Sequence, residues 1–332
     1  MGMPRLGTQQ AKAAPFLLPP VAEQARIAQK LDELLAMVDT LKSRLDTIPS
    51  LLKRFHQSTL SSAVSGRLTS DWRARQEINI NADHPESADE ANCDLLDFYY
   101  KAAPLGELAD FQNGFAFKSE WFQKEKGTQV IKIGNIRDGR AEMENSPSFV
   151  SNEIAHEARR FLTVDGDILI SMTGTKYKRD YGFACPVDAG VLVNQRVGKI
   201  RAKKSKIHEK YLLICLRSSV FREQFFKGET GQVSQGNVGS EHIKKCMIPV
   251  PEIEEQIEIV RRVEQLFTFA ERLDFRVQNT KSRIDTLYQS ILAKAFRGEL
   301  VSQNPNDEHA CLLLERIQTQ RALNRGKLGI KR

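Results

Sequence analysis

The stretch LPPVAEQARIAQKLDELLAMVDTLKSRL (residues 18–45) decides the fold, because its apolar residues recur at alternating intervals of four and three. The spacing continues beyond this stretch and defines one seam of apolar side chains: Ile27, Leu31, Leu34, Val38, Leu41, Leu45, Ile48, Leu52 and Phe55. A strict 3.5-residue repeat keeps a narrow seam facing a partner helix over many turns, which is typical of a coiled coil. The seam therefore predicts a helix longer than the core of one compact domain requires.

The chain contains a second copy of this pattern. Residues 18–69 align with residues 250–301 without a gap, and about 14 of the 52 aligned pairs are identical. The second copy has its own seam, at Ile259, Val263, Leu266, Ala270, Leu273, Val277, Thr280, Ile284, Leu287 and Ile291. Both seams have the same spacing, so the repeat predicts two helices of the same kind.

The two predicted helices span residues 19–69 and residues 251–301. Pro49 removes one backbone hydrogen bond from the first, which predicts a kinked but continuous helix, with a broken helix as the alternative. A helix pair buried in an ordinary bundle is the other interpretation of the seams. Two matching copies that flank a whole domain favour the coiled coil.

The composition is that of an ordinary globular chain. Its 332 residues, 41% hydrophobic and 27% charged, exclude a disordered or collagen-like protein and suggest about two domains. The formal net charge of +7 favours an anionic partner. No apolar run is long enough for a membrane span and the first twenty residues do not resemble a signal peptide, so we expect a cytoplasmic protein without membrane contact. Five scattered cysteines without a C-x-x-C pair predict reduced structural thiols.

Two different kinds of sequence separate the helices. Residues 70–103 contain eight acidic residues and little apolar periodicity, which predicts an acidic linker. Residues 104–250 contain short β-type runs, at 129–133, 167–172, 191–193 and 197–200, and helical stretches at 151–161 and 210–226. We therefore expect an α/β (α+β) fold, with a mixed globular domain between two long helices and a C-terminal tail at residues 302–332.

Three turn-rich loops of this domain combine cations, amides and aromatic side chains. They lie at residues 174–182, 194–196 and 231–237, in a region with 16 basic and 8 acidic residues between positions 160 and 245. Arg and Lys donate to phosphates and guanine, and Asn and Gln pair with adenine, so such loops can bind and read DNA. The alternative is that these charged loops are only solvated. The candidates for DNA contact are Lys176, Tyr177, Lys178, Arg179, Asn194, Gln195, Arg196, Gln232, Gln235 and Asn237.

The sequence lacks the motifs of common enzymes. It has no phosphate-binding P-loop, no dinucleotide fingerprint, no H-E-x-x-H and no G-x-S-x-G. The N-P-P-[FYW] motif of amino-methyltransferases is also missing, since the nearest approach, Asn304-Pro305-Asn306, fails at its third position. The six histidines have no metal-ligand spacing. We therefore expect a non-catalytic chain without a metal site.

Six motifs occur in a fixed order along the chain. They are LPPVAEQARI (residues 18–27), FQNGFAFKS (111–119), IKIGNIRDG (131–139), GDILISMTG (166–174), LVNQRVGKI (192–200) and PEIEEQIEI (251–259). In this order they resemble the specificity (S) subunit of type I restriction-modification enzymes. The resemblance covers nearly the whole chain.

The resemblance implies two target-recognition domains per subunit, each followed by a helix. The two helices pack as an antiparallel coiled coil, so that the domains read the two halves of an interrupted DNA site. Only one domain is intact here, because residues 1–18 align in the same register with the end of residues 104–250. We therefore expect residues 1–18 to be the stub of a first recognition domain, and a homodimer is one way to restore the second domain.

The resemblance also implies the partners. Double-stranded DNA binds the recognition domain, modification subunits carry S-adenosylmethionine, and restriction subunits use ATP and magnesium, so this chain would direct adenine methylation and cleavage while binding no cofactor itself. Polar residues beside the seams are expected to face these subunits: Glu33, Lys53, Arg54 and Arg272. Gly114, Gly134 and Gly174 are expected in tight turns. A coiled-coil adaptor, or an inactive remnant with non-specific DNA binding, remains the alternative.

Overall fold

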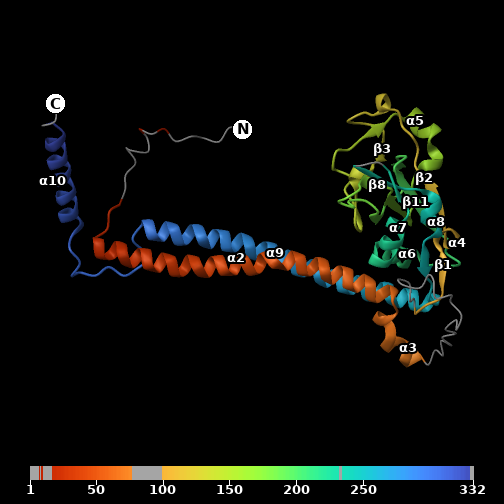
Figure 1. The fold of residues 1–332 in the computed structure, drawn as a ribbon, viewed down its shortest axis with the longest axis horizontal. Helices are drawn as coiled ribbons and strands as arrows, with labels where there is room; N and C mark the ends of the chain where they lie inside the picture. The colour runs from red at the N-terminus through yellow and green to blue at the C-terminus, as the bar shows by residue number, and fades with distance from the viewer. Residues whose placement is uncertain (1–6, 8, 10–16, 77–98, 232–233, 330–332) are drawn as a thin grey trace. The chain divides into compact units, whose positions relative to one another are not determined.

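The computed structural model describes residues 7, 9, 17–76, 99–231 and 234–329 (Figure 1). The chain divides into two compact units, here termed the helical unit (Met1–Leu51 with Glu271–Arg332) and the domain unit (Leu52–Ala270). Two 44-residue helices, α2 (Val21–Val64) and α9 (Ile253–Phe296), contribute a part to each unit. The expected class, mixed helix and strand with two long helices, is confirmed.

In the helical unit, α2 and α9 run side by side and antiparallel (Figure 1). Lys42 contacts Asp285 at 2.7 Å and Asp46 contacts Lys281 at 2.6 Å, so residue numbers rise along one helix as they fall along the other. The apolar cluster between the helices contains Val38, Ile284 and Ile291, with Leu31, Leu34, Leu35, Leu45, Tyr288 and Leu300 packed against it. Pro49 lies inside α2, which continues through it as one helix.

The buried seam is narrower than its sequence pattern. Val38 and Ile284 are 3% and 7% exposed, whereas Leu41 and Leu287, which the 3.5-residue spacing places in the same seam, are 45% and 48% exposed. Positions one heptad from Val38 and Ile284 stay packed, since Leu31 and Leu45 contact the cluster and Ile291 is 8% exposed. The partner helix therefore covers Val38 and Ile284 more fully than the other apolar position of their heptads.

The domain unit begins with the last turns of α2, which end at Gly66 in the left-handed conformation (φ 78°) that favours glycine. The helices η1 (Arg67–Thr69) and α3 (Ser70–Gln76) follow. Residues 70–76, predicted as the start of an acidic linker, are thus a helix. Residues 77–98 of the predicted linker lie outside the described residues.

Short sheets form the mixed domain predicted at residues 104–250. The largest is antiparallel in the order β2 (Ala109–Asn113), β11 (Val197–Ala202), β7 (Asp167–Ser171), β9 (Ala184–Pro186). A second sheet has the order β10 (Leu192–Val193), β3 (Thr128–Ile131), β6 (Phe149–Val150), and a third has the order β12 (Glu229–Thr230), β13 (Gln235–Val238), β8 (Thr173–Thr175). Two further pairs are β1 (Ala102–Pro104) with β14 (Met247–Pro249), and β4 (Ile136–Arg137) with β5 (Arg140–Ala141). The predicted β-type runs therefore correspond to β3, β7, β10 and β11.

The helices of the domain occupy the two predicted helical stretches. The first contains α5 (Asn152–Glu157) and η4 (Arg159–Phe161), and the second contains α6 (Glu209–Arg217) and α7 (Ser219–Lys227). Ser218 separates the latter two because its hydroxyl accepts a hydrogen bond from Phe221 N at 3.2 Å and so caps α7. The remaining helices are α4 (Leu105–Leu108), η2 (Ser119–Trp121), η3 (Ile133–Asn135), α8 (Ser240–Lys245) and, in the helical unit, α10 (Ala310–Gly329).

The central strand β7 is buried on both faces. Ile168 and Ile170 belong to the cluster that includes Tyr211 and Phe225 of α6 and α7, whereas Leu169 belongs to a second cluster on the opposite face. Successive residues of a strand point to opposite faces, so a strand covered on both sides has no polar alternation. This burial explains the continuous apolar run within residues 166–174.

The two copies of the internal repeat form equivalent hydrogen bonds at the start of their helices. Gln24 Nε2 donates to the carbonyl of Pro19 at 2.8 Å, and Gln256 Nε2 donates to the carbonyl of Pro251 at 2.8 Å. The two long helices thus begin in the same way. Gln256 Oε1 also accepts a hydrogen bond from His208 N at 2.8 Å, which ties the start of α9 to the residue that precedes α6.

The described cysteines are free thiols. Cys185, Cys215 and Cys246 are buried, and burial raises the pKa of each to about 12, whereas Cys311 is exposed. None of the described helices combines the length and the apolar character that crossing a bilayer requires.

Candidate nucleic-acid interface

Two of the three predicted loops are brought together by the pairing of β8 with β13. The register places Gln235 opposite Thr175 and Asn237 opposite Thr173. Thr173 Oγ1 donates to Asn237 Oδ1 at 2.8 Å, and the Lys176 main-chain amide donates to the carbonyl of Ser234 at 3.3 Å. The loop after β8 and the loop before β13 therefore form one surface, although about 60 residues separate them in the sequence.

The third predicted loop, residues 194–196, joins the same edge through Met172. The Met172 amide donates to the carbonyl of Arg196 at 3.0 Å, and its carbonyl accepts from Val238 N at 3.0 Å. Met172 thus connects the start of β11, the start of β8 and the end of β13. The structure therefore brings nine of the ten candidates to one edge of the domain. The tenth, Gln232, lies outside the described residues.

The candidate side chains differ in exposure. Tyr177 is 81% exposed, and Lys178, Arg179, Gln195, Arg196 and Gln235 are also exposed, whereas Lys176, Asn194 and Asn237 are half-buried. Lys176 Nζ donates to the carbonyl of Gly231 at 3.4 Å and Arg179 lies over the ring of Phe226, and the ion pairs found among the described residues include none of the cations Lys176, Lys178, Arg179 and Arg196. The edge therefore presents cations, amides and one aromatic ring to solvent, which are the groups that bind phosphates and base edges.

Arg222 of α7 holds the loop that carries these cations. Its guanidinium donates to the carbonyls of Arg179 at 3.1 Å, Tyr181 at 3.1 Å and Gly182 at 2.8 Å, and it lies over the ring of Phe226. Burial lowers the pKa of Arg222, because the charged form is partly removed from water. One half-buried cation therefore holds three backbone carbonyls within residues 179–182.

A second set of hydrogen bonds stabilises the same loop. Asp180 Oδ1 accepts from Thr175 N at 2.7 Å and its Oδ2 accepts from Thr175 Oγ1 at 3.0 Å, and these bonds lower the pKa of the Asp180 carboxyl. Tyr181 OH donates to Glu229 of β12. Arg179 has a left-handed backbone (φ 47°), which is unusual for a residue other than glycine. The loop is therefore preformed, which reduces the ordering cost of binding.

Two glycines near this edge allow close packing. A Cβ on Gly114 would lie 2.1 Å from the carbonyl oxygen of Asn194, and one on Gly174 would lie 2.7 Å from Asp180 Oδ1. Neither glycine has a positive φ. Their role is therefore the close approach of neighbouring segments rather than a left-handed turn.

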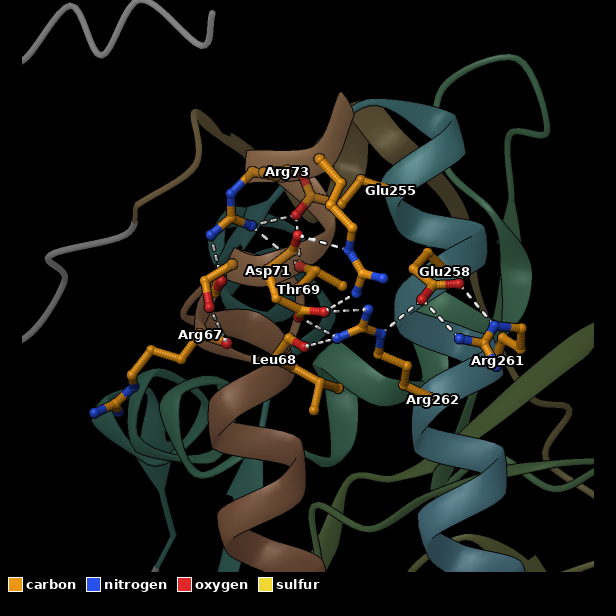
Figure 2. Close-up of polar contacts among 12 residues, drawn as sticks. Arg67, Leu68, Thr69, Asp71, Arg73, Glu255, Glu258, Arg261 and Arg262 are labelled. Carbon is orange, nitrogen blue, oxygen red and sulfur yellow. Dashed lines mark hydrogen bonds and ion pairs between the residues drawn. The ribbon is translucent and has the colours of Figure 1, made fainter. Parts of the chain in front are cut away.

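A separate polar network, shown in Figure 2, joins the end of α2 to the start of α9. Glu255 is 2% exposed and accepts hydrogen bonds from Thr69 Oγ1 at 2.6 Å and from Tyr100 OH at 2.7 Å. Arg73 forms an ion pair with the same carboxylate and also donates to the carbonyl of Gly66. These contacts connect η1 and α3 with α9, and Tyr100 adds the segment that leads into β1.

Arg262 and Arg261 extend this network along α9 (Figure 2). Arg262 contacts Asp71 at 2.5 Å, the carbonyl of Leu68 at 2.8 Å and Glu258 at 2.6 Å. Hydrogen bonds from Arg261 and Arg262 lower the pKa of Glu258 to about 2, and Arg262 lowers the pKa of Asp71. Charged groups therefore tie α3 to the start of α9, and the lowered pKa values keep Glu258 and Asp71 charged at neutral pH.

Sequence reasoning missed Arg222, Asp180 and Met172 as parts of this edge. Arg222 lies in a helix among other charged residues, and nothing in its sequence context distinguishes it. Asp180 lies within a loop that the sequence selected for its cations, and Met172 acts only through its backbone. Their roles follow from tertiary contacts.

The structure combines a mixed domain that has an exposed edge rich in cations and amides with two long helices. The family model described as "Type I restriction modification DNA specificity domain" matches residues 100–274. The EcoBI specificity subunit of Escherichia coli is 35% identical over 320 residues, covering 93% of this chain and 65% of that protein. The EcoKI subunit of Escherichia coli strain K12 is 33% identical (93% and 64%), and the Escherichia coli EcoDI subunit is 32% identical (93% and 69%).

Solved structures have the same fold. The HsdS subunit from Thermoanaerobacter tengcongensis superposes with a TM-score of 0.53 at 20% identity, covering 90% of this chain and 65% of that one. A chain from a study of the assembly of a type I R-M system gives a TM-score of 0.58 at 20% identity (85% and 61%). This chain belongs to the family of type I restriction-modification specificity subunits. It spans slightly less than two thirds of the length of the EcoBI and EcoKI subunits.

Proposed function

We propose that this chain selects the DNA site at which a type I restriction-modification complex acts. The observation that carries the proposal is the convergence of three separate loops, through β8, β13 and Met172, on one edge of the domain. Cations on this edge would hold phosphates, and its amides would read base edges in the major groove. The proposal fits the similarity of the chain to proteins named specificity subunits.

The chemistry would belong to other subunits. In this proposal, the chain is non-catalytic, modification subunits bind S-adenosylmethionine and methylate adenine, and restriction subunits use ATP and magnesium for translocation and cleavage. The complex would act in the cytoplasm, where its DNA is. Exposed polar residues along α2 and α9 would face these subunits: Glu33, Lys53, Arg54 and Arg272.

A second recognition domain would complete a bipartite site. Gln256 at the start of α9 binds the amide of His208 in the recognition domain, but its repeat equivalent Gln24 has no such partner among the described residues. We propose that a second domain, supplied by a second copy of this chain, binds near Gln24. A two-fold dimer of this kind would read an inverted repeat. Light scattering tests this: a dimer has twice the 37.6 kDa mass of one chain, and a single-chain mass at micromolar concentration would contradict the dimer.

Duplex binding tests the main proposal. The full chain, purified with its modification subunits, should bind double-stranded DNA with an affinity that falls steeply with salt, because bound cations release counterions from the duplex. Binding should be stronger to a target selected from random sequence than to an unrelated duplex. Salt-dependent binding without any sequence preference would instead support an inactive remnant that binds DNA non-specifically. No duplex binding at all would support a coiled-coil adaptor.

A further inference from the structure

Neither the backbone conformation nor the packing of the domain requires glycine at position 134. It lies in the middle of the short helix η3, is exposed, and has no positive φ. A Cβ at this position would meet no atom within 4 Å. Alanine is more stable than glycine in helical turns, because glycine loses more backbone freedom on folding. The expected role in a tight turn therefore does not explain Gly134.

This separates Gly134 from other glycines of the domain. Gly114 and Gly174 are needed for close packing, as described above, and Gly190 has a left-handed backbone (φ 89°). Gly239 also has an open Cβ position and no positive φ, but it is the N-cap of α8, where glycine is favoured over alanine.

The turn that carries Gly134 is fixed in place. Asn135 is 5% exposed, and its Oδ1 accepts a hydrogen bond from Lys132 N at 3.0 Å. Its Nδ2 donates to the carbonyls of Glu142 at 3.0 Å and Asn145 at 2.6 Å. The buried neighbour thus anchors the turn, and Gly134 is held on the outside of it.

The turn also continues the edge that carries the DNA-contact candidates. Strand β3 ends at Ile131, whose carbonyl accepts a hydrogen bond from Asn194 N at 3.1 Å, and Ile131 is paired with Val193. Gly134 therefore follows directly from the strand that borders the loop at residues 194–196. The cations that flank the turn in sequence all have partners: Arg137 and Arg140 form ion pairs with Glu142, and Lys132 Nζ donates to Ser148 Oγ at 2.9 Å. A ligand could therefore approach Gly134 closely because the space beside it is open, and not because an unpaired charge attracts the ligand.

We propose that the sugar-phosphate backbone of the bound DNA passes in van der Waals contact with the main chain at Gly134. This inference rests on the proposed function of the edge as a DNA surface. Any side chain at this position would occupy the space that the duplex needs. Because backbone contacts position the protein without reading sequence, the contact affects all DNA sequences alike.

The test compares three variants in the full complex with modification subunits. Gly134→Ala should keep or raise the melting temperature and weaken DNA binding about 5-fold, and Gly134→Leu should weaken it about 50-fold, since overpacking grows with side-chain size. The loss should be the same for target and unrelated duplexes. The control Gln123→Leu, which adds an apolar side chain at an exposed uncharged position before β3, should leave DNA binding unchanged.

Hydroxyl-radical footprinting gives a second readout that does not depend on affinity. At saturating protein, Gly134→Leu should lose protection of one or two adjacent sugars that the wild-type complex protects. Unchanged affinity and footprint in both Gly134 variants, while Lys178→Ala still weakens binding, would overturn this inference and leave the proposed function intact. A wild-type complex that does not bind duplex DNA would overturn both.

Discussion

The main-chain amide of Met172 donates a hydrogen bond to the carbonyl of Arg196 at 3.0 Å. This bond aligns the start of β11 with the start of β8, and the carbonyl of Met172 in turn accepts from Val238 at 3.0 Å. Three loops that are far apart in the sequence are therefore held side by side by one residue that contributes no polar side chain. The candidate DNA surface consequently depends on the backbone of the domain as much as on its exposed side chains.

Loss of a loop cation should weaken binding without changing sequence preference. Lys178 is exposed, and its charge helps to lower the pKa of the neighbouring Asp180 carboxyl, so Lys178→Ala removes an exposed charge that can contact phosphate. Binding measured by fluorescence anisotropy should weaken for every duplex, and the slope of log K against log salt should become smaller by about 1. Lys124→Ala, an exposed lysine before β3, is the control and should leave the slope unchanged. An equal effect of the two variants would argue against a specific role for the loop.

Asn237 offers a nearly isosteric test of a polar contact. Its Oδ1 is occupied by the hydroxyl of Thr173 at 2.8 Å, which leaves its Nδ2 to donate to DNA. Asn237→Asp keeps the acceptor for Thr173 but replaces the donor with a charged oxygen that phosphates and base acceptors repel. The melting temperature should change little, and DNA affinity should fall by about 10-fold or more, as expected for loss of about 1–3 kcal/mol.

Asn152→Asp is the control for that charge change. Asn152 is exposed and begins α5, where a negative charge is compatible with the helix dipole. If both substitutions reduce DNA binding equally, the effect is one of overall charge, and Asn237 is not a contact.

Arg222 should position the loop without touching DNA. Arg222→Met keeps an apolar stem against Phe226 but removes the hydrogen bonds to the carbonyls of Arg179, Tyr181 and Gly182. Stability should fall by about 1–3 kcal/mol, because buried carbonyls lose their partners. Hydrogen exchange should become faster within residues 176–182 while the amides of β7 and β11 stay protected. Arg159→Met, at an exposed position in η4, should alter neither; uniform faster exchange in the Arg222 variant would mean global destabilisation instead.

The helical unit provides a direct test of which seam residues pack. Val38→Ala removes buried methyl groups from the helix interface and should lower the free energy of unfolding by about 1–2 kcal/mol. Leu41→Ala removes more atoms, but Leu41 is 45% exposed and the change should stay within about 0.5 kcal/mol. Chemical denaturation of the two variants measures the difference. A larger loss of unfolding free energy for Leu41→Ala than for Val38→Ala would instead support the wider seam that the sequence pattern indicates.

The long helices and the strands were predictable from the sequence because their signals are local. Apolar spacing in residues 18–69 and 250–301 reports a helix directly, and the run around Ile168 reports a buried strand. The exposure of Leu41 was not predictable from a 3.5-residue spacing, because the spacing identifies the apolar face but not how fully the partner helix covers each position on it. The three loops were also predictable from the sequence, because each combines residue types that bind DNA.

The arrangement of these loops was not predictable. Their meeting depends on the register of β8 against β13 and on the hydrogen bonds of Met172, which involve residues about 25 to 65 positions apart. The anchoring role of Arg222 has the same origin, since its partners lie about 40 residues before it. The helix at residues 70–76 was assigned to the acid-rich stretch that follows it, because its contacts with Glu255 and Arg262 come from the distant α9.

The most direct test of the central claim is to map methylated adenines on random-sequence DNA at single-base resolution. The chain would be purified with its modification subunits, and the wild type would be compared with a Gln195→Ala, Gln235→Ala double variant, which changes two exposed amides on the candidate edge. We predict one defined motif for the wild type and a motif relaxed at particular base positions for the variant. Identical motifs for the two proteins, or wild-type methylation without sequence preference, would contradict the claim that this edge reads DNA.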